Sequence, residues 1–309
     1  MRRGLLRLIG LVVFALILYK VDIFKILPVL KDVNLYLLVI VILLAAPMMS
    51  LKILRWSSIL VMQDIKLPLR DAFSAYLASY YIGLVTPGRL GDFAKILYLH
   101  RAREVPYGKA SVSALMDRLF DMVLIVLVGI IGICAFGLFN RFGYASFALL
   151  ALIVALFASL FKQSVLDRIL MIVYRGLAKK YRDRVQLHFE DFIAGMNRLK
   201  SPRLLLPILL TVAAYTITFI QCYLIALALD IHVSFFYVAF AISMAGLVAL
   251  IPISFAGIGT RDATVIFLFG LVGIGSQKAL GFSLLYLVVF ALAVGVWGAV
   301  HWFKSPVKL

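Results

Sequence analysis

Residues 80–101 read YYIGLVTPGRLGDFAKILYLHR and interrupt a chain that is otherwise rich in Leu, Val, Ile, Ala and Phe. Several apolar runs elsewhere in the chain reach about 20 residues, the length that a helix needs to cross a bilayer. This stretch instead places a proline, glycines and charged side chains in the middle of such a run. The break and its charges therefore decide how the chain is threaded through a membrane.

The composition is that of an integral membrane protein. Of 309 residues, 64% are hydrophobic and 15% are charged, whereas soluble domains carry about 25% charged residues. The apolar periods fit helices rather than the alternating strands of an outer-membrane barrel. The longest polar stretch, 162–202, is too short to bury a catalytic core. We therefore expect an all-α polytopic membrane protein.

Neither a metal site nor a bound cofactor is expected. The two cysteines, Cys134 and Cys222, lie within hydrophobic runs, and the four histidines are scattered. The net charge of +17 would suggest nucleic acid in a soluble protein, but here it fits the positive-inside rule. No nucleic-acid partner is expected.

The basic, apolar start resembles a signal peptide but lacks a small-residue cleavage site, so it is interpreted as the first membrane helix.

The hydrophobic pattern predicts about six full spans and two broken segments. The full spans are 4–21, 34–54, 111–137, 143–161, 203–229 and 279–301. The broken segments are 71–104 and 234–273. Each of their halves is roughly 15 residues, or about 22 Å of helix, which suits a re-entrant hairpin better than a span.

Lysine and arginine counts give the orientation. With both hairpins re-entrant and the start inside, the inner stretches hold 23 basic residues and the outer ones four. Cytoplasmic loops carry this excess. We expect a multi-pass protein of the cell's inner (cytoplasmic) membrane, with both termini cytoplasmic.

The same topology predicts an inverted repeat within one membrane domain, 1–309. Each half, about 1–137 and 143–303, reads span, span, hairpin, span. Gly/Pro-broken segments at matching positions indicate a transporter's binding site; the alternative is that they are simple kinks. Residues 164–200 carry an amphipathic stripe and are expected to lie on the anionic inner leaflet, against the cytoplasmic ends of the bundle, or both.

Charged residues at membrane depth are costly and are functional candidates. They form three clusters: Arg89 and Asp92 with Lys95; Asp117, Arg118 and Asp121; and Arg261 and Asp262. The helix starts after each break offer free N–H groups, and nearby glycines let a ligand approach the backbone. These glycines are Gly88, Gly91, Gly257 and Gly259. With arginine beside them they suit phosphate. The alternative is that Arg and Asp only neutralise each other and lock the bundle.

Several motifs resemble those of the lysylphosphatidylglycerol synthase transmembrane, or flippase-like, family over nearly the whole chain. They are TPGRLGD at 86–92, MDRLFD at 116–121, IPISFAGIGTRD at 251–262 and LKILRWSSIL at 51–60, with its Arg-Trp pair. The family motifs usually end in Glu where this chain has Asp92 and Asp262. The resemblance implies movement of a lipid between leaflets, by a chain without the soluble synthase domain of two-domain relatives.

The leading hypothesis is a lipid translocator rather than an enzyme, with no catalytic residues. Arg89, Arg118 and Arg261 would bind the lipid phosphate with the four glycines, while Asp92, Asp117, Asp121 and Asp262 would hold the headgroup or exchange protons. No G-x-x-x-x-G-K-[ST] motif occurs, so transport would not use ATP. The alternatives are a membrane-embedded transferase acting on a lipid phosphate, and a non-catalytic membrane partner of a lipid- or glycan-modifying enzyme. Candidate protein partners are a lipid-biosynthetic enzyme and a second copy of the chain.

Overall fold

The computed structural model describes residues 31–86, 89–138, 179–199, 201–249, 257–290 and 294–304. These described residues form α- and 3-10 helices and contain no strand, which confirms the predicted all-α class. The predicted spans 4–21 and 143–161 lie outside them. Within these described ranges, three helices are long and apolar enough to cross a membrane: α3 (Leu35–Met62), α6 (Tyr107–Ala135) and α10 with its preceding turn (Pro202–Ala228).

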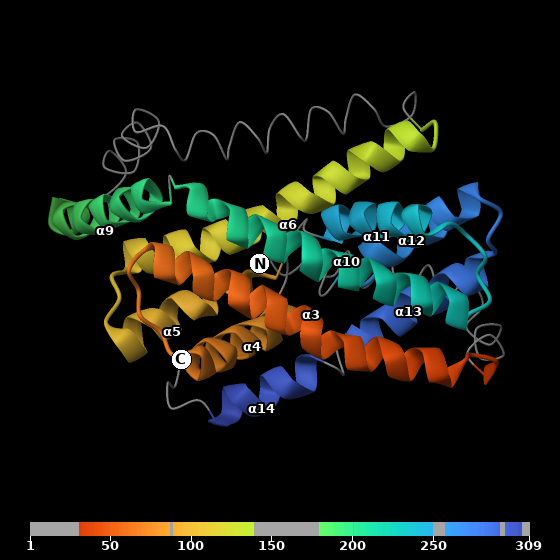
Figure 1. The fold of residues 1–309 in the computed structure, drawn as a ribbon, viewed down its shortest axis with the longest axis horizontal. Coiled ribbons are helices and arrows are strands. Elements are labelled where there is room, and N and C mark those ends of the chain that lie inside the picture. Colours follow the sequence, from red (N-terminus) through yellow and green to blue (C-terminus); the bar gives the residue numbers. More distant parts are fainter. Residues whose placement is uncertain are drawn as a thin grey trace.

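Helices α3 and α10 (Leu205–Ala228) form a closely packed antiparallel pair at the centre of the fold (Figure 1). At one end, the Asn34 N–H donates to the Ala228 carbonyl at 3.1 Å. Further along, the Gln221 amide donates to the carbonyl of Val41 at 2.7 Å. This pair defines two ends of the bundle, which we call the Asp230 end and the Asp64 end after the exposed residues found there.

Helix α3 continues eight residues beyond the predicted end at residue 54 and includes Pro47 without stopping. The count of 23 inner basic residues includes Lys52 and Arg55, because the stretch 52–70 is predicted to be cytoplasmic. For these two residues the prediction is wrong, because both are within this helix and Arg55 is fully buried. Lys95, also counted with the inner loops, is buried as well. Without these three the inner count falls from 23 to 20 against four, so the charge bias and the predicted orientation persist.

The first broken segment consists of α4 (Leu69–Val85), the 3-10 turn η2 (Leu90–Phe93) and α5 (Ala94–Arg103). Arg103 at the end of α5 forms an ion pair with Asp71 at the start of α4. The two arms therefore meet at the Asp64 end, as expected for a hairpin.

The second broken segment consists of α11 (Phe235–Ala249) and α12 (Thr260–Leu271). The Tyr237 hydroxyl near the start of α11 donates to the carbonyl of Leu268 near the end of α12, at 2.5 Å. These arms meet at the Asp230 end, so the two segments open at opposite ends of the α3–α10 pair (Figure 1). Six full spans and two membrane re-entrant hairpins remain a prediction.

The predicted span 279–301 corresponds to α13 (Ser276–Phe290) and α14 (Val296–Lys304), with 291–293 outside the described residues. Helix α14 packs on α4, and α6 packs on α11. Glycines make both contacts close: a Cβ on Gly298 would lie 2.5 Å from the Leu77 carbonyl oxygen, and one on Gly132 would lie 2.3 Å from the Phe240 ring. These paired contacts are compatible with the inverted repeat, which remains a prediction.

Helix α9 (Lys179–Arg198) covers the second half of the predicted amphipathic stretch and packs along α6. A Cβ on Gly108 would lie 2.1 Å from the His188 carbonyl oxygen, so the two backbones approach closely. Met196 and Leu199 are buried in the same cluster as Ile59. Packing against the bundle, one of the two expectations, is thus present; contact with the inner leaflet remains a prediction.

Candidate functional site

A cavity of about 150 Å³ lies between the two broken segments. Its wall is built from residues of α4, the cap of η2, α6, α10, α11, the turn before α12, α12 and α13. Four charged side chains line it: Arg89, Arg118, Asp121 and Arg261. The rest of the lining consists of apolar residues, glycines and uncharged polar residues, the latter being Tyr80, Tyr215, Tyr286, Thr218 and Ser243. The structure therefore brings all three predicted arginines to one cavity.

Arg89 enters the cavity from a turn with left-handed backbone. Its φ of 56° is unusual for a non-glycine residue and is costly by about 1–3 kcal/mol. The Arg89 guanidinium lies 4.6 Å from the centre of the Tyr80 ring, and its Nε lies 3.3 Å from Asp92 Oδ2. The Thr86 hydroxyl accepts the Gly91 N–H at 2.7 Å and braces the turn. The surroundings thus hold a strained residue at the cavity wall.

Asp92 is a buried carboxylate shared by two arginines. Besides Arg89 it forms an ion pair with Arg118 of α6. It packs against α4 so closely that a Cβ on Gly83 would lie 2.3 Å from Asp92 Oδ1. A Cβ on Gly91 would lie 2.4 Å from the Ile82 carbonyl carbon. The missing side chain of Gly91 therefore serves the contact between η2 and α4, and its predicted approach to a ligand remains a prediction.

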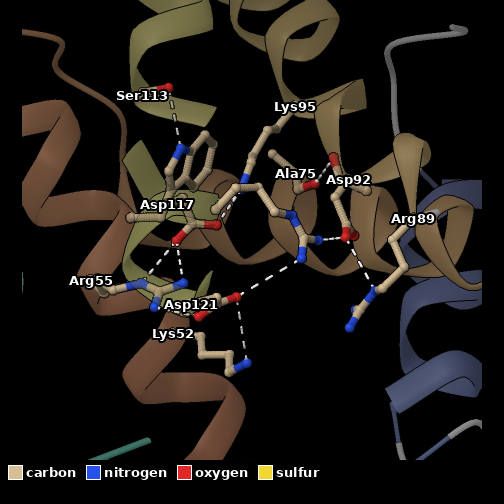
Figure 2. A network of polar contacts seen from close by, with 12 residues as sticks. Lys52, Arg55, Ala75, Arg89, Asp92, Lys95, Ser113, Asp117 and Asp121 are labelled. Carbon is tan, nitrogen blue, oxygen red and sulfur yellow. Dashed lines mark hydrogen bonds and ion pairs between the residues drawn. The ribbon is translucent and has the colours of Figure 1, made fainter. Parts of the chain in front are cut away.

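Arg55 of α3 is the centre of a buried polar network (Figure 2). Its Nε and Nη2 donate to Asp117 Oδ1 at 2.9 and 2.6 Å. Its Nη1 donates to Asp121 Oδ1 at 2.6 Å and to the Thr211 hydroxyl of α10 at 3.3 Å. The predicted pair Asp117 and Asp121 does share one face of α6, and that face meets α3.

Two lysines extend this network. Lys95 donates to Asp117 Oδ2 and lies 4.7 Å from the Tyr76 ring centre. Lys52 lies 3.9 Å from Asp121 Oδ2 and 4.6 Å from the Tyr215 ring centre. The predicted site did not include Lys52 or Arg55. Their spacing of three residues, on a helix face with an apolar continuation to Met62, is the signal that could have found them.

The second break forms a smaller, self-contained arrangement. Arg261 donates to Ser283 Oγ of α13 at 2.9 Å and to Asp262 Oδ1 at 2.7 Å. Asp262 accepts the Gly259 N–H at 2.8 Å and the Ser283 hydroxyl at 2.5 Å. Asp262 therefore caps its own helix, α12. It is fully buried, whereas Arg261 reaches the cavity wall.

The glycines differ in what the structure assigns to them. Gly257 lines the cavity with φ of 76°, a conformation that glycine adopts without strain. The Gly259 N–H, expected to be open to an anion, is instead occupied by the Asp262 carboxylate. Gly88 lies outside the described residues.

The alternative interpretation is that Arg and Asp only neutralise each other and lock the bundle. The ion pairs support it only in part. Asp117 and Asp262 are buried and bonded to basic side chains, so they do neutralise arginines. Among the described residues of the two networks, however, six are basic and four acidic. The basic ones are Lys52, Arg55, Arg89, Lys95, Arg118 and Arg261; the acidic ones are Asp92, Asp117, Asp121 and Asp262. Mutual neutralisation is incomplete.

A search of the described residues finds no group of three His, Cys, Asp or Glu side chains that could hold a metal ion. The chemistry that the cavity offers is electrostatic: three guanidinium groups, tyrosine hydroxyls and an apolar wall. Guanidinium groups bind phosphate through paired hydrogen bonds. The site therefore suits an anionic group joined to an apolar molecule.

Comparison with known proteins identifies a family for this chain. No curated protein matches this chain in sequence. Residues 5–298 match the model of the lysylphosphatidylglycerol synthase TM region, which covers the six predicted spans almost entirely. Together with three helices of membrane-crossing length, this match makes the chain a multi-pass membrane protein. It belongs to the lysylphosphatidylglycerol synthase transmembrane family.

Proposed function

We propose that the protein moves a polar, phosphate-containing lipid between the leaflets of the cytoplasmic membrane without hydrolysing ATP. The observation that carries this proposal is the cavity in which Arg89, Arg118 and Arg261 meet from the two broken segments and α6. A headgroup phosphate would bind these arginines, while the acyl chains remain against the apolar wall and the surrounding lipid. Family membership supports a lipid-related membrane role.

The opposite openings of the two broken segments suggest how a headgroup would cross. The first segment opens at the Asp64 end and the second at the Asp230 end, and their breaks meet at the cavity. A headgroup could then exchange between Arg89 on one side and Arg261 on the other. Alternating access around such a midplane site is the mode that inverted-repeat transporters use.

Leaflet movement in liposomes tests the proposal. The full chain is reconstituted with a fluorescent phosphate-headgroup lipid, and an impermeant quencher reports the fraction reached in the outer leaflet. Arg89→Lys and Arg261→Lys should each slow movement by about tenfold, because an ammonium cannot replace the paired donors. Arg203→Lys, on the exposed turn before α10, is the matched control and should leave the rate unchanged.

Two results would contradict the proposal. Wild-type protein that moves no phosphate lipid would refute translocation, and full rates in both lysine variants would refute phosphate binding by arginine. Mass spectrometry of the same liposomes looks for a modified lipid. A new lipid product would support the transferase alternative instead.

The energy source has its own test. Asp121 is the predicted acidic residue that reaches the cavity wall, so it is the first candidate for proton exchange. If protons drive transport, Asp121→Asn should abolish the response of the rate to an imposed pH gradient while lipid binding persists. Equal wild-type rates with and without a gradient would make the protein a passive scramblase.

A further inference from the structure

Two positive charges in the buried networks have no counter-ion among the described residues, when side chains are counted at their formal charges. Asp92 is the shared partner of Arg89 and Arg118, which leaves one positive charge. Asp117 and Asp121 together serve Arg55, Lys95 and Lys52, and Asp121 also lies 3.9 Å from Arg118. Three carboxylates therefore face five basic side chains, and a second positive charge remains. Arg261 and Asp262 balance each other.

Two nitrogen atoms in the same place lack hydrogen-bond partners. Arg89 Nε and Arg118 Nε are buried, and neither makes a hydrogen bond in the described part of the chain, although Arg89 Nε lies 3.3 Å from Asp92 Oδ2. Both side chains line the cavity, and that of Arg89 is 31% exposed. A buried donor without an acceptor and a charge without a counter-charge are both costly. The Arg118 Nε atom and the excess of positive charge therefore point to an anion that the cavity receives.

We infer that the cavity selects lipids whose headgroup ends in a phosphomonoester, which carries two negative charges, over lipids with singly charged, zwitterionic or cationic headgroups. This inference rests on the proposed function and specifies its substrate class. A phosphomonoester carries about −1.5 to −2 charges at pH 7 and has three strong acceptor oxygens. It matches both the excess of two positive charges and the three guanidinium groups at the wall.

The acidic residues are not available to bind a cationic headgroup in the cavity. Asp92, Asp117 and Asp262 are buried in ion pairs away from the cavity lining. Asp121 reaches the lining, but its Oδ1 is bonded to Arg55 at 2.6 Å. An ammonium in the cavity would therefore meet three arginines and a carboxylate that is already paired.

Binding of defined lipids to the purified full chain in detergent tests the inference by thermal stabilisation. The probes are phosphatidate, phosphatidylglycerol and phosphatidylcholine with the same short acyl chains, and glycerol 3-phosphate as the soluble counterpart. At pH 8, phosphatidate should reach half-maximal stabilisation at a concentration about tenfold lower than phosphatidylglycerol, the effect of roughly one charge-assisted hydrogen bond. Glycerol 3-phosphate should stabilise far less.

Lowering the pH separates headgroup charge from headgroup shape. The second pKa of a phosphomonoester is about 6, so phosphatidate loses most of its second charge at pH 5. Its advantage over phosphatidylglycerol should then largely disappear. Phosphatidylglycerol does not titrate in this range and reports any change in the protein itself, including the lining groups Asp121, the three arginines and the tyrosines. None of the described histidines lines the cavity.

A variant that removes one positive charge tests whether the preference for phosphatidate depends on the excess of two positive charges. Arg118→Gln leaves Asp92 paired with Arg89 alone and reduces the excess from two to one, so the advantage of phosphatidate at pH 8 should fall about tenfold. Arg203→Gln changes the total charge by the same amount at an exposed position and should leave the advantage intact. The wild-type comparison of lipids stands even if Arg118→Gln does not fold.

Each contrary result has a distinct meaning. Equal stabilisation by phosphatidate and phosphatidylglycerol at pH 8 would overturn the inference and leave the proposed function standing. Equal stabilisation by glycerol 3-phosphate and phosphatidate would identify a soluble phosphate as the ligand and overturn both. No stabilisation by either phosphate lipid would overturn the proposed function itself.

Discussion

The two broken segments carry the same residue types but handle their charges differently. In the first, Asp92 is shared between Arg89 of its own turn and Arg118 of α6, and positive charge remains in excess. In the second, Asp262 caps its own helix and pairs with the adjacent Arg261, and charge is balanced. The neighbours of a Gly/Arg/Asp cluster, rather than the cluster, therefore determine whether it has spare charge for a ligand.

The comparison also extends to the glycines. Gly91 in the first segment is required because two pieces of backbone touch, since a Cβ there would lie 2.5 Å from the Ile82 carbonyl oxygen. Gly257 in the second segment is required by its φ of 76° and also by packing, since a Cβ there would lie 2.9 Å from Ala249 Cβ. One glycine thus serves packing alone, and the other serves both packing and backbone conformation at the cavity wall.

The opposite openings of the two segments predict an all-or-none difference in accessibility. Single cysteines at Lys66 near the first opening and His232 near the second, both exposed positions, are probed in intact cells with an impermeant thiol reagent. His232→Cys should label from outside and Lys66→Cys should not, because the charge bias places the Asp64 end inside. The background is Cys134→Ser, since Cys134 is exposed. Labelling of position 66 but not 232 would reverse the orientation.

Removal of one carboxylate from each network tests the difference in charge balance. Asp117→Asn leaves Arg55 and Lys95 without their shared acceptor and raises the positive excess to three, so we expect a loss of about 3–5 kcal/mol. Asp262→Asn also leaves Arg261 without its carboxylate, but it should cost less, about 1–3 kcal/mol, because Arg261 retains Ser283 and lines the cavity, whereas Arg55 is fully buried. Unfolding of the purified variants in detergent measures both.

The matched control is the exposed pair at the opening of the first segment. Asp71→Asn breaks the Arg103–Asp71 ion pair, in which both side chains are about one-third exposed, and should cost at most about 1 kcal/mol. If Asp262→Asn destabilised the protein as much as Asp117→Asn, the distinction between an overcharged and a balanced network would be wrong.

Glycine substitutions test packing against conformation. Gly91→Ala should cost about 1–3 kcal/mol by overpacking, and Gly91→Asn should be no better. Gly257→Ala should also destabilise, through its φ and through contact of the new Cβ with Ala249. Gly257→Asn should recover only the conformational part of this loss, because Asn tolerates a left-handed backbone. Gly270→Ala in α12, where a Cβ meets nothing within 4 Å, is the control and should be neutral or stabilising. Equal behaviour of Ala and Asn at both sites would remove the distinction.

The smallest effect is expected at the opening of the second segment. Hydrogen bonds from Lys278 and His232 lower the pKa of the exposed Asp230 carboxyl. The stability that this carboxylate contributes is therefore present above its unfolded pKa of about 4 and is lost as the pH falls through the lower folded pKa. Asp230→Asn should lower Tm slightly at pH 6, and the difference should shrink progressively as the pH falls below about 4. A difference that grows on acidification would contradict this assignment.

The helical class, the two broken segments with Arg89 and Arg261, and the charged Arg118 within an apolar span could be predicted from the sequence because they depend on local properties. An apolar run of membrane length, and a Pro-Gly break with charges inside it, limit the conformations that a chain can adopt in lipid. The family that the four motifs indicated is also confirmed by the match over residues 5–298.

The positions of Lys52 and Arg55 could not be predicted from charge alone. A basic residue after 20 apolar ones normally marks the end of a span, whereas here α3 continues because Asp117 and Asp121 on α6 receive the Arg55 guanidinium. That pairing joins residues about sixty positions apart. Hydropathy of a single segment contains no information about it.

The sequence by itself determined that this chain is a helical membrane protein with two charged breaks, since hydropathy and backbone restriction act within one segment. Only the tertiary structure decided which charges are neutralised, which glycines serve packing, and that Arg89, Arg118 and Arg261 line one cavity. The physical reason is that electrostatic balance in a buried site is a sum over all neighbours within a few ångströms. Those neighbours come from α3, α6, α12 and α13, which only folding brings together.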